Sequence, residues 1–205
     1  MNLYNIMIKT LFIYGNGGFG KEVFDIAKRT KKFKNIYFLD DNYYSSSINV
    51  FSFEEAINFS NNNSAKFILG IGDPSTRIVL YNKLLKHKCE LTSIIDPTAI
   101  ISDKASIGKG VVICAFGIVG PDTNIGNNVV LNVQGIIGHD INICDHCVLS
   151  SQVNIGGGSS IGQGCYIGMA SIVKEGIEIG DGSVLGMGSS LHRNLDSNLI
   201  AMGNP

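Results

Sequence analysis

Residues 124–161 read NIGNNVVLNVQGIIGHDINICDHCVLSSQVNIGGGSSI, and an aliphatic side chain returns in this stretch at every sixth position. The spacing holds without insertion through Ile95, Ile101, Ile107, Ile113, Val119, Ile125, Leu131, Ile137, Ile143, Leu149, Ile155, Ile161, Ile167, Val173, Ile179, Leu185 and Leu191. Glycine often follows the aliphatic residue, and the position four residues after it is mostly small or β-branched. A six-residue period predicts a β-helix, in which each hexad forms one face of a prism.

The repeat gives each kind of side chain a location in this prism. The aliphatic residues point inward, the small residues fill the narrow space beside them, and glycine suits the corner of each coil. Stacked coils hydrogen-bond to one another at the strand spacing of about 4.8 Å. With three hexads to a coil, residues 95–190 amount to about five coils.

Composition divides the chain into two parts. Of its 25 glycines, six lie in residues 1–94 and nineteen in residues 95–205. The first part carries 12 basic and 8 acidic side chains, and the second carries 4 and 9. We therefore expect two domains with these bounds. The net charge of −1 argues against a nucleic-acid-binding surface, and no apolar run approaches the roughly 18 residues of a membrane span.

Residues 1–94 are expected to form a small parallel α/β sheet. Apolar runs at 11–14, 36–39 and 67–71 each end at glycine or aspartate, which is typical of buried parallel strands. Apolar residues recur at helical spacing in 21–30 and again in 75–87, where Ser75 is the expected N-cap. Strands that alternate with helices indicate a Rossmann-like half of a doubly wound sheet.

Glycines stand between the first strand and the first helix. Gly15, Gly17 and Gly20 have the spacing G-x-G-x-x-G, and Asp40 follows about 20 residues later. Backbone N–H groups at such a turn approach a phosphate, and the acid meets a ribose hydroxyl. Only one half of a dinucleotide fold fits into the first part, so we expect a mononucleotide diphosphate. A tight strand–helix turn without a ligand is the alternative.

His139 is the expected general base. It lies in segment 137–140, Ile-Gly-His-Asp, at an outward position of the repeat. Residues 18 apart lie above one another in a β-helix, so glycines 156–158 cover residues 138–140 and leave a recess beside the imidazole. The neighbouring carboxylate of Asp140 would hold one tautomer of the imidazole and raise its basicity. An exposed His-Asp pair beside a chance run of glycines is the alternative.

The cysteines do not indicate a metal site or a disulfide framework. Cys144 and Cys147 have the spacing of a metal half-site, but the repeat assigns Cys144 to a corner and Cys147 to a small interior position, as it does Cys165. His146 takes an outward position and is expected on the surface, with a subunit contact as the alternative. Five cysteines, and no secretory signal in residues 1–10, indicate reduced thiols in a cytoplasmic protein.

The chain as a whole resembles one group of bacterial enzymes. Its repeat is similar to that of the left-handed β-helix acyltransferases, and the handedness comes from this resemblance. The preceding α/β domain makes the chain similar to the nucleotide-sugar N-acetyltransferases of the PglD type and the sialic-acid O-acetyltransferases of the NeuD group. The motifs that carry the resemblance are YGNGGFG (14–20), FLDD (38–41), IGDPSTR (71–77), GHD (138–140) and GNP (203–205).

The resemblance implies roles for individual residues. His139 would be the general base, with Asp140 in support. The nucleotide of the sugar substrate would be held by Gly15, Gly17, Gly18, Phe19, Asp40, Asp41 and Gly72. The co-substrate acetyl-CoA would lie along the β-helix, at the seam between two subunits of a homotrimer, against Gly157, Met169 and Met187.

We therefore expect transfer of acetyl from acetyl-CoA to the amine of a nucleotide-linked amino-sugar, a 4-amino-4,6-dideoxyhexose, without a metal ion. Such a step belongs to O-antigen, capsule or protein-glycan biosynthesis. The alternatives are O-acetylation of a sialic acid, a metal-dependent hydratase resembling γ-class carbonic anhydrase, and a non-catalytic scaffold. Two features depart from the family: Val148 replaces a second histidine that some members carry, and the chain ends at Pro205, where the family usually continues.

Overall fold

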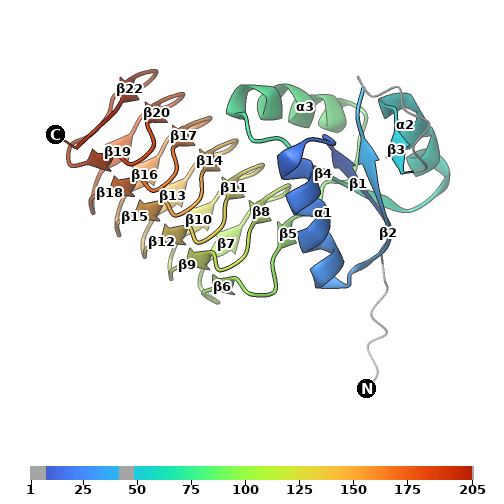
Figure 1. The fold of residues 1–205 in the computed structure, drawn as a ribbon, viewed down its shortest axis with the longest axis horizontal. Coiled ribbons are helices and arrows are strands. Elements are labelled where there is room, and N and C mark those ends of the chain that lie inside the picture. The colour runs from blue at the N-terminus through green and yellow to red at the C-terminus, as the bar shows by residue number, and fades with distance from the viewer. Residues whose placement is uncertain (1–7, 42–48, 205) are drawn as a thin grey trace.

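The computed structural model describes residues 8–41 and 49–204 (Figure 1). A small α/β unit packs against the first coils of a long β-helix, and the C-terminus lies at the far end of that β-helix. The expected fold class, an α/β part followed by a parallel β-helix, is confirmed. Pro205 of the GNP motif and residues 1–7 lie outside the described ranges. No helix within those ranges is long and apolar enough to cross a membrane.

Four parallel strands form the N-terminal sheet, in the order β3-β2-β1-β4. Their bounds are Ile8–Tyr14 for β1, Phe33–Leu39 for β2, Val50–Phe51 for β3 and Ala65–Leu69 for β4. The central strand β1 lies between β2 and β4, and Leu11, Phe12 and Ile13 in it are completely buried. A strand covered on both faces needs a continuous apolar run, which is the pattern seen in the sequence.

Helices α1 (Gly18–Thr30) and α3 (Pro74–Lys86) follow β1 and β4 as expected. The prediction that Ser75 caps α3 is wrong. Asp73 is the N-cap, and its side chain accepts the backbone N–H of Thr76 at 2.7 Å. Pro74 then occupies the first helical turn, where its missing N–H costs nothing.

The sequence prediction missed strand β3 and helix α2 (Phe53–Asn62). A readable signal preceded the helix. Ser52 and Glu55 form a capping box, in which the serine hydroxyl accepts the N–H of Glu55 and the glutamate accepts the N–H of Ser52. A strand of two residues leaves too short a pattern to be read.

The β-helix consists of three parallel sheets, one for each side of the prism. The seven-strand sheet contains β5 (Ile94–Ile95), β8 (Val112–Ile113), β11 (Val130–Leu131), β14 (Val148–Leu149), β17 (Tyr166–Ile167), β20 (Val184–Leu185) and β22 (Ile200–Ala201). The six-strand sheet contains β6 (Ile100–Ile101), β9 (Ile118–Val119), β12 (Ile136–Ile137), β15 (Asn154–Ile155), β18 (Ile172–Val173) and β21 (Ser190–Leu191). The five-strand sheet contains β7 (Ser106–Ile107), β10 (Asn124–Ile125), β13 (Asn142–Ile143), β16 (Ser160–Ile161) and β19 (Glu178–Ile179).

The register follows the period predicted from the sequence. Ile137 pairs with Ile155 in the next coil, a step of 18 residues. The estimate of about five coils was too low. Pairing starts at Ile94 and continues to Ala201, which makes about six turns, and the last step, from Val184 to Ile200, is two residues shorter than the others.

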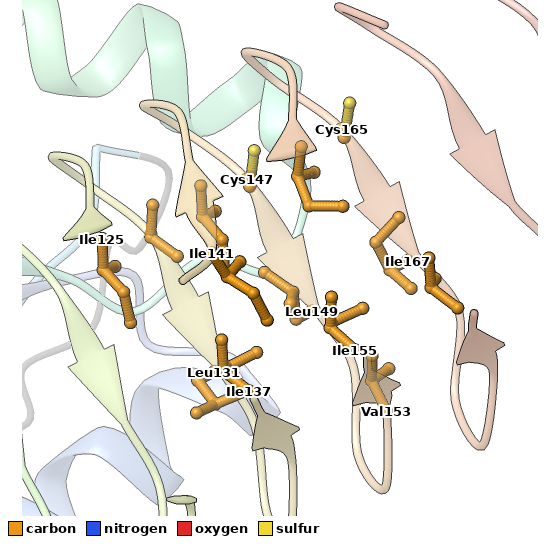
Figure 2. Packing of buried hydrophobic residues seen from close by; sticks show 14 of the residues in the cluster. Ile125, Leu131, Ile137, Ile141, Cys147, Leu149, Val153, Ile155, Cys165 and Ile167 are labelled. Atoms are coloured by element: carbon orange, nitrogen blue, oxygen red, sulfur yellow. The ribbon is translucent and has the colours of Figure 1, made fainter. Parts of the chain in front are cut away.

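The repeated aliphatic residues form one continuous core inside the prism. Figure 2 shows part of this column, with Leu131, Leu149 and Ile167 from successive coils of the seven-strand sheet. The small residues lie beside them, and Val153 and Cys165 are completely buried. Because each coil covers the next, the core grows with the number of repeats.

The sequence prediction assigned the repeat glycines to the corner of each coil, and this explanation is wrong. A Cβ on Gly120 would lie 2.5 Å from the carbonyl oxygen of Gly138 in the next coil, so close stacking of the coils excludes a side chain there. The left-handed backbone falls two residues later, in every hexad from residue 110 to residue 188, as at Asp122 (φ 55°) and Gly158 (φ 70°). Glycine therefore follows the aliphatic residue because the coils stack too closely to leave room for a side chain.

The α/β unit covers the outer face of the seven-strand sheet. Val112, Val130 and Val148 point outward from that sheet and pack into a single buried cluster with residues of β1 and α1. At its margin, Arg29 of α1 donates to the Asp96 carboxylate from Nε at 2.8 Å and from Nη2 at 2.5 Å. The unit therefore lies on the side of the prism opposite the edge at which the other two sheets meet.

Candidate functional site

His139 lies at the edge between the six-strand and five-strand sheets. It follows Ile137 of β12 and precedes β13, in the turn that joins the two sheets. We call the turns of this edge, stacked from coil to coil, the His139 edge. The backbone of Asp140 adopts the left-handed conformation (φ 55°), and its N–H donates to the carbonyl of Pro121 in the preceding coil at 3.0 Å. The turn that carries the histidine is therefore fixed by the stacking of coils.

The side chains of His139 and Asp140 form a hydrogen-bonded pair. Nδ1 of the imidazole lies 2.7 Å from Oδ2 of the carboxylate, and the side chains are 67% and 66% exposed. A carboxylate accepts hydrogen bonds, so this contact places the proton on Nδ1 and leaves the lone pair on Nε2. An exposed Nε2 with a fixed tautomer is able to take a proton from a bound amine or hydroxyl.

Gly157 lies directly beside the His139 imidazole, as the 18-residue stacking predicted. A Cβ on Gly157 would stand 2.7 Å from both Cε1 and Nε2 of the ring. The space that the missing side chain leaves is therefore occupied by the imidazole itself, rather than left free beside it. Gly158 has no neighbouring atom within 4 Å of such a Cβ, so the surface next to the ring is open.

The glycines of the N-terminal loop fall into two kinds. Gly15 (φ 114°) and Gly20 are packing residues, because a Cβ on Gly20 would collide with the carbonyl oxygen of Gly15. Gly17 and Gly18 have open space where a side chain would be. Gly17 is the N-cap of α1 and Gly18 its first residue, and the N–H groups of a first turn have no partner inside the helix. An anion can approach the backbone at this point.

Phe19 differs from the other predicted substrate residues. Its side chain is half-buried and packs against the cluster between α1 and the seven-strand sheet. The same cluster contains Val148, which is 3% exposed. The position at which some family members carry a second histidine is therefore covered by the α/β unit of the same chain.

Asp40 and Asp41 lie at the carboxyl end of β2, beside the glycine loop. The backbone N–H of Asn16 points at Oδ2 of Asp40 at a distance of 3.4 Å. Oδ2 of Asp41 accepts from the Tyr14 hydroxyl at 2.5 Å and from Nζ of Lys83 at 2.7 Å. Burial alone would raise the pKa of Asp41, but the hydrogen bonds from Lys83 and Tyr14 outweigh it and lower that pKa. Burial and the bond to Asp41 in turn raise the pKa of Tyr14.

A hollow of about 730 Å³ opens next to Asp41. Its lining comes from α2, α3 and the residues that precede α2, and includes Phe53, Lys83 and His87. Nζ of Lys83 lies 3.9 Å from the centre of the Phe53 ring, and the same ring meets His87 edge to face. The sequence prediction missed this hollow because it had no helix at 53–62.

Gly72 lies in a second hollow, between α3 and the β-helix. Asp73 and Pro74 line it from the start of α3, and Gly164 and Tyr166 from the β-helix. A side chain at Gly72 would meet no atom within 4 Å. The structure therefore brings Gly17, Gly18 and the Asp40–Asp41 pair together at the carboxyl ends of β1 and β2, and Gly72 follows β4 at the same end of the sheet.

The three residues predicted for acetyl-CoA are not on one edge. Gly157 belongs to the His139 edge, whereas Met169 and Met187 lie on the edge between the seven-strand and six-strand sheets. The two methionines occupy successive coils, where the N–H of Gly188 donates to the carbonyl of Met169 at 2.7 Å. They are 50% and 81% exposed. Within one chain, the six-strand sheet separates them from Gly157.

The surface position predicted for His146 is wrong. Its ring is 6% exposed, stands 2.9 Å from Nδ2 of Asn128 through Nδ1, and meets the Tyr81 ring edge to face. Burial lowers its pKa. The interior positions predicted for Cys147 and Cys165 are confirmed, because both are completely buried. In the described part of the chain, no three His, Cys, Asp or Glu residues gather into a group that could hold a metal ion.

Two family models match the chain, one in the α/β unit and one in the β-helix. Residues 10–84 match the PglD N-terminal domain. Residues 158–193 match the hexapeptide repeat of succinyl-transferase, which agrees with the β-helix. No curated protein sequence matches the chain.

Several solved structures match nearly the whole chain. A histidine-to-alanine mutant of GDP-perosamine N-acetyl transferase from Caulobacter crescentus, in complex with CoA and GDP-perosamine, is 24% identical with a TM-score of 0.90 and covers 96% of this chain and 94% of its own. The acetyltransferase domain of PglB from Neisseria gonorrhoeae FA1090, in complex with acetyl coenzyme A, is 22% identical with a TM-score of 0.89 and coverage of 95% and 96%. WeeI from Acinetobacter baumannii AYE is 22% identical with a TM-score of 0.86 and coverage of 95% and 97%. At these identities the likeness establishes the fold.

Proposed function

We propose that the protein transfers acetyl from acetyl-CoA to the amine of a nucleotide-linked amino-sugar. The observation that carries the proposal is the His139–Asp140 pair, with its exposed Nε2, on a chain whose fold matches a GDP-perosamine N-acetyl transferase along 96% of its length. We propose a 4-amino-4,6-dideoxyhexose as the sugar. The N-terminal sheet with its open glycine loop supports an acceptor that carries a nucleotide.

The proposed reaction is a direct attack on the thioester. The amine nitrogen forms a bond to the carbonyl carbon of acetyl-CoA, the carbon–sulfur bond breaks, and CoA leaves as its thiolate. Nε2 of His139 takes the proton that the nitrogen loses and can return it to the departing sulfur. Asp140 holds the imidazole in the required tautomer throughout. Burial raises the pKa of the Cys89 thiol to about 11 and of the Cys114 thiol to about 12, so neither is suited to form an acyl-enzyme.

The nucleotide is proposed to bind at the carboxyl ends of the strands of domain 1–94, with domain 95–205 supplying the base. The phosphates would meet the first turn of α1 at Gly17 and Gly18. Asp40 would accept a ribose hydroxyl. The hollow beside Asp41, with the Phe53 ring in its wall, has the apolar and charged groups that suit a nucleobase.

The opposite positions of the two half-sites support a neighbouring copy as part of the site. His139 lies on the edge of the prism that faces away from the α/β unit of its own chain. We infer that the nucleotide held by one copy meets His139 of the next copy, in a trimer. The same arrangement would bring Met169 and Met187 of one copy toward Gly157 of another, which their separation within one chain otherwise prevents. With Val148 buried, backbone N–H groups would contact the thioester oxygen.

A thermal-shift screen tests the choice of substrates. We expect a rise in melting temperature with CoA and with one of the UDP-, dTDP-, GDP- or CMP-linked sugars, because a ligand that binds only the folded state stabilises it. A shift with free sialic acid or CMP-sialic acid alone would favour O-acetylation. Failure to bind any CoA would favour a non-catalytic scaffold.

Mixed oligomers test whether two copies form one site. His139→Ala removes the base, and Gly17→Asp puts a negative charge into the phosphate loop. Each variant alone should be inactive. Co-expressed, they should regain roughly a quarter of wild-type activity, because about one seam in four combines an intact loop with an intact base in a closed ring. Sites that lie within a single chain would stay inactive in the mixture, and that result would contradict the shared site.

A further inference from the structure

Arg77 is a completely buried charge that the proposed chemistry does not use. It lies in the first turns of α3 and is 0% exposed. Burial lowers the pKa of its guanidinium to about 9, which still leaves it charged at neutral pH. Within residues 8–41 and 49–204 no ion pair joins Arg77 to a carboxylate. Its charge is instead surrounded by backbone carbonyls and one side-chain amide.

The Arg77 guanidinium binds both halves of the molecule at once. Toward the N-terminal sheet, Nη1 donates to the carbonyl of Ile71 at 2.7 Å and to that of Leu69 at 3.2 Å. Toward the β-helix, Nη2 donates to Oδ1 of Asn128 at 2.6 Å and to the carbonyl of Gly110 at 3.5 Å, and Nε donates to the carbonyl of Asn128 at 3.1 Å. The planar fork of an arginine provides these five donors in a fixed geometry, which a lysine ammonium lacks.

The acceptor on the β-helix side is itself held in place. Asn128 has a left-handed backbone (φ 57°), and its Nδ2 donates to the backbone carbonyl of Arg77 at 3.3 Å and faces Nδ1 of His146 at 2.9 Å. His146 in turn packs against Tyr81 on the next turn of α3. The network is therefore a closed ring. Arg77 of α3 contacts the Asn128 amide, this amide contacts the His146 imidazole, and the imidazole packs against Tyr81 of the same helix.

Stability alone does not require this arrangement. Desolvation of a buried charge is expensive, and well-packed apolar residues often replace a buried ionic network at no loss. The planar guanidinium instead fixes how the N-terminal sheet is oriented relative to the β-helix. It ties Leu69, the last residue of β4, and Ile71 just after it to residues 110 and 128 in two successive coils.

We propose that Arg77 is a positioning residue that fixes the Ile71–Gly72 segment of the nucleotide site relative to the β-helix. The inference rests on the proposed function, in which the β-helix carries both the base and the seam with the next copy. The angle between the α/β unit and the prism then determines where a bound amine meets the His139 of the neighbour. A displacement of about 1 Å at a reacting centre costs about a hundred-fold in rate.

Arg77→Lys tests the proposal, with Leu84→Ala as the matched control. Leu84 is a completely buried residue of the same helix that packs in the sheet cluster, and its apolar side chain takes no part in the hydrogen bonds of the Arg77 network. We expect Arg77→Lys to lower kcat about ten- to hundred-fold while the KM for acetyl-CoA stays within about two-fold. Leu84→Ala should lower the melting temperature and leave kcat per folded enzyme unchanged. Equal kcat in wild type and Arg77→Lys would overturn the proposal.

A second measurement separates this proposal from the proposed function. Amide hydrogen exchange at Gly70 and Asn128 reports the local geometry without any substrate, because these N–H groups bond the carbonyls of Tyr14 and Lys109 on either side of the fork. We expect exchange at both amides to rise about ten-fold in Arg77→Lys and in Arg77→Met, relative to Leu84→Ala. If the wild type does not transfer acetyl but exchange rises as expected, the proposed function fails and the positioning role stands. Unchanged exchange in either folded variant would refute the positioning role.

Discussion

The β-helix and the α/β unit obtain their structures in different ways. In the β-helix, one rule is applied seventeen times and fixes the inward positions, and the candidate functional residues His139 and Gly157 occupy an outward position that the rule leaves free. In the α/β unit, no such rule repeats, and single residues such as Gly20 and Arg77 each make a contact that occurs only once in the unit. The repeat therefore shows which positions are free to carry function, whereas in the single sheet the functional residues stand among positions that all differ.

Replacement of His139 should produce the largest effect of any single change. His139→Ala removes the proposed base from an exposed position, so we expect turnover to fall by about 10²- to 10⁴-fold with little change in melting temperature. His192→Ala is the matched control, since His192 is another exposed histidine at the C-terminal end of the β-helix. Turnover of His139→Ala at the level of the control would mean that His139 is not the catalytic residue.

A core substitution in the repeat should lower the stability of the fold rather than the rate of the reaction. Leu149 is completely buried within the column of aliphatic residues. Leu149→Ala should therefore lower the free energy of unfolding by about 2–5 kcal/mol, through lost burial and the cavity left behind. Chemical denaturation measures the loss. A change below about 1 kcal/mol would indicate that neighbouring coils collapse around the gap, and that the repeat is more plastic than its packing implies.

Gly157→Ala should show that Gly157 makes room for the His139 imidazole, whereas other repeat glycines make room for the next coil. The added methyl group would press on Cε1 and Nε2 of His139, so the imidazole must turn away from its position. We expect turnover to fall about a hundred-fold. Gly158→Asn is the control, because that position is open and asparagine tolerates its left-handed backbone. Equal losses in the two variants would show that the methyl group disturbs the turn in general.

The smallest predicted effect lies in the α/β unit. Asp73→Ala removes the N-cap of α3 and should cost about 1 kcal/mol of stability. Hydrogen bonds from Ser75 and Thr76 lower the pKa of Asp73, so the cap contributes above its unfolded pKa, about 3.9, and is lost as pH falls through the lower folded pKa. Urea titrations at pH 7 and below pH 3 should show the difference between wild type and variant at the higher pH only. A pH-independent difference would mean that the carboxylate is not what stabilises the helix.

The sequence predicted the β-helix almost completely because its period is a property of many residues at once. It also predicted that Gly157 lies over His139, since stacking arithmetic follows from the period. It could not predict contacts between units that are far apart in the chain. The outward position expected for His146 is correct within the repeat, yet Tyr81 of α3 covers its ring, and Asn128 of the preceding coil lies against its Nδ1. The hollow beside Asp41 was missed for the same reason, because three separate segments line it.

Acetyl transfer itself is tested most directly by CoA release from the intact protein, with and without the acceptor. With acetyl-CoA and a nucleotide-linked 4-amino-4,6-dideoxyhexose, we expect one CoA thiol for each N-acetylated sugar, and an unchanged protein mass when acetyl-CoA is added alone. This result would mean that the amine attacks the thioester without an acyl-enzyme. Thiol release that needs no acceptor, an acetylated protein, or no release with any nucleotide-linked amino-sugar would contradict the account.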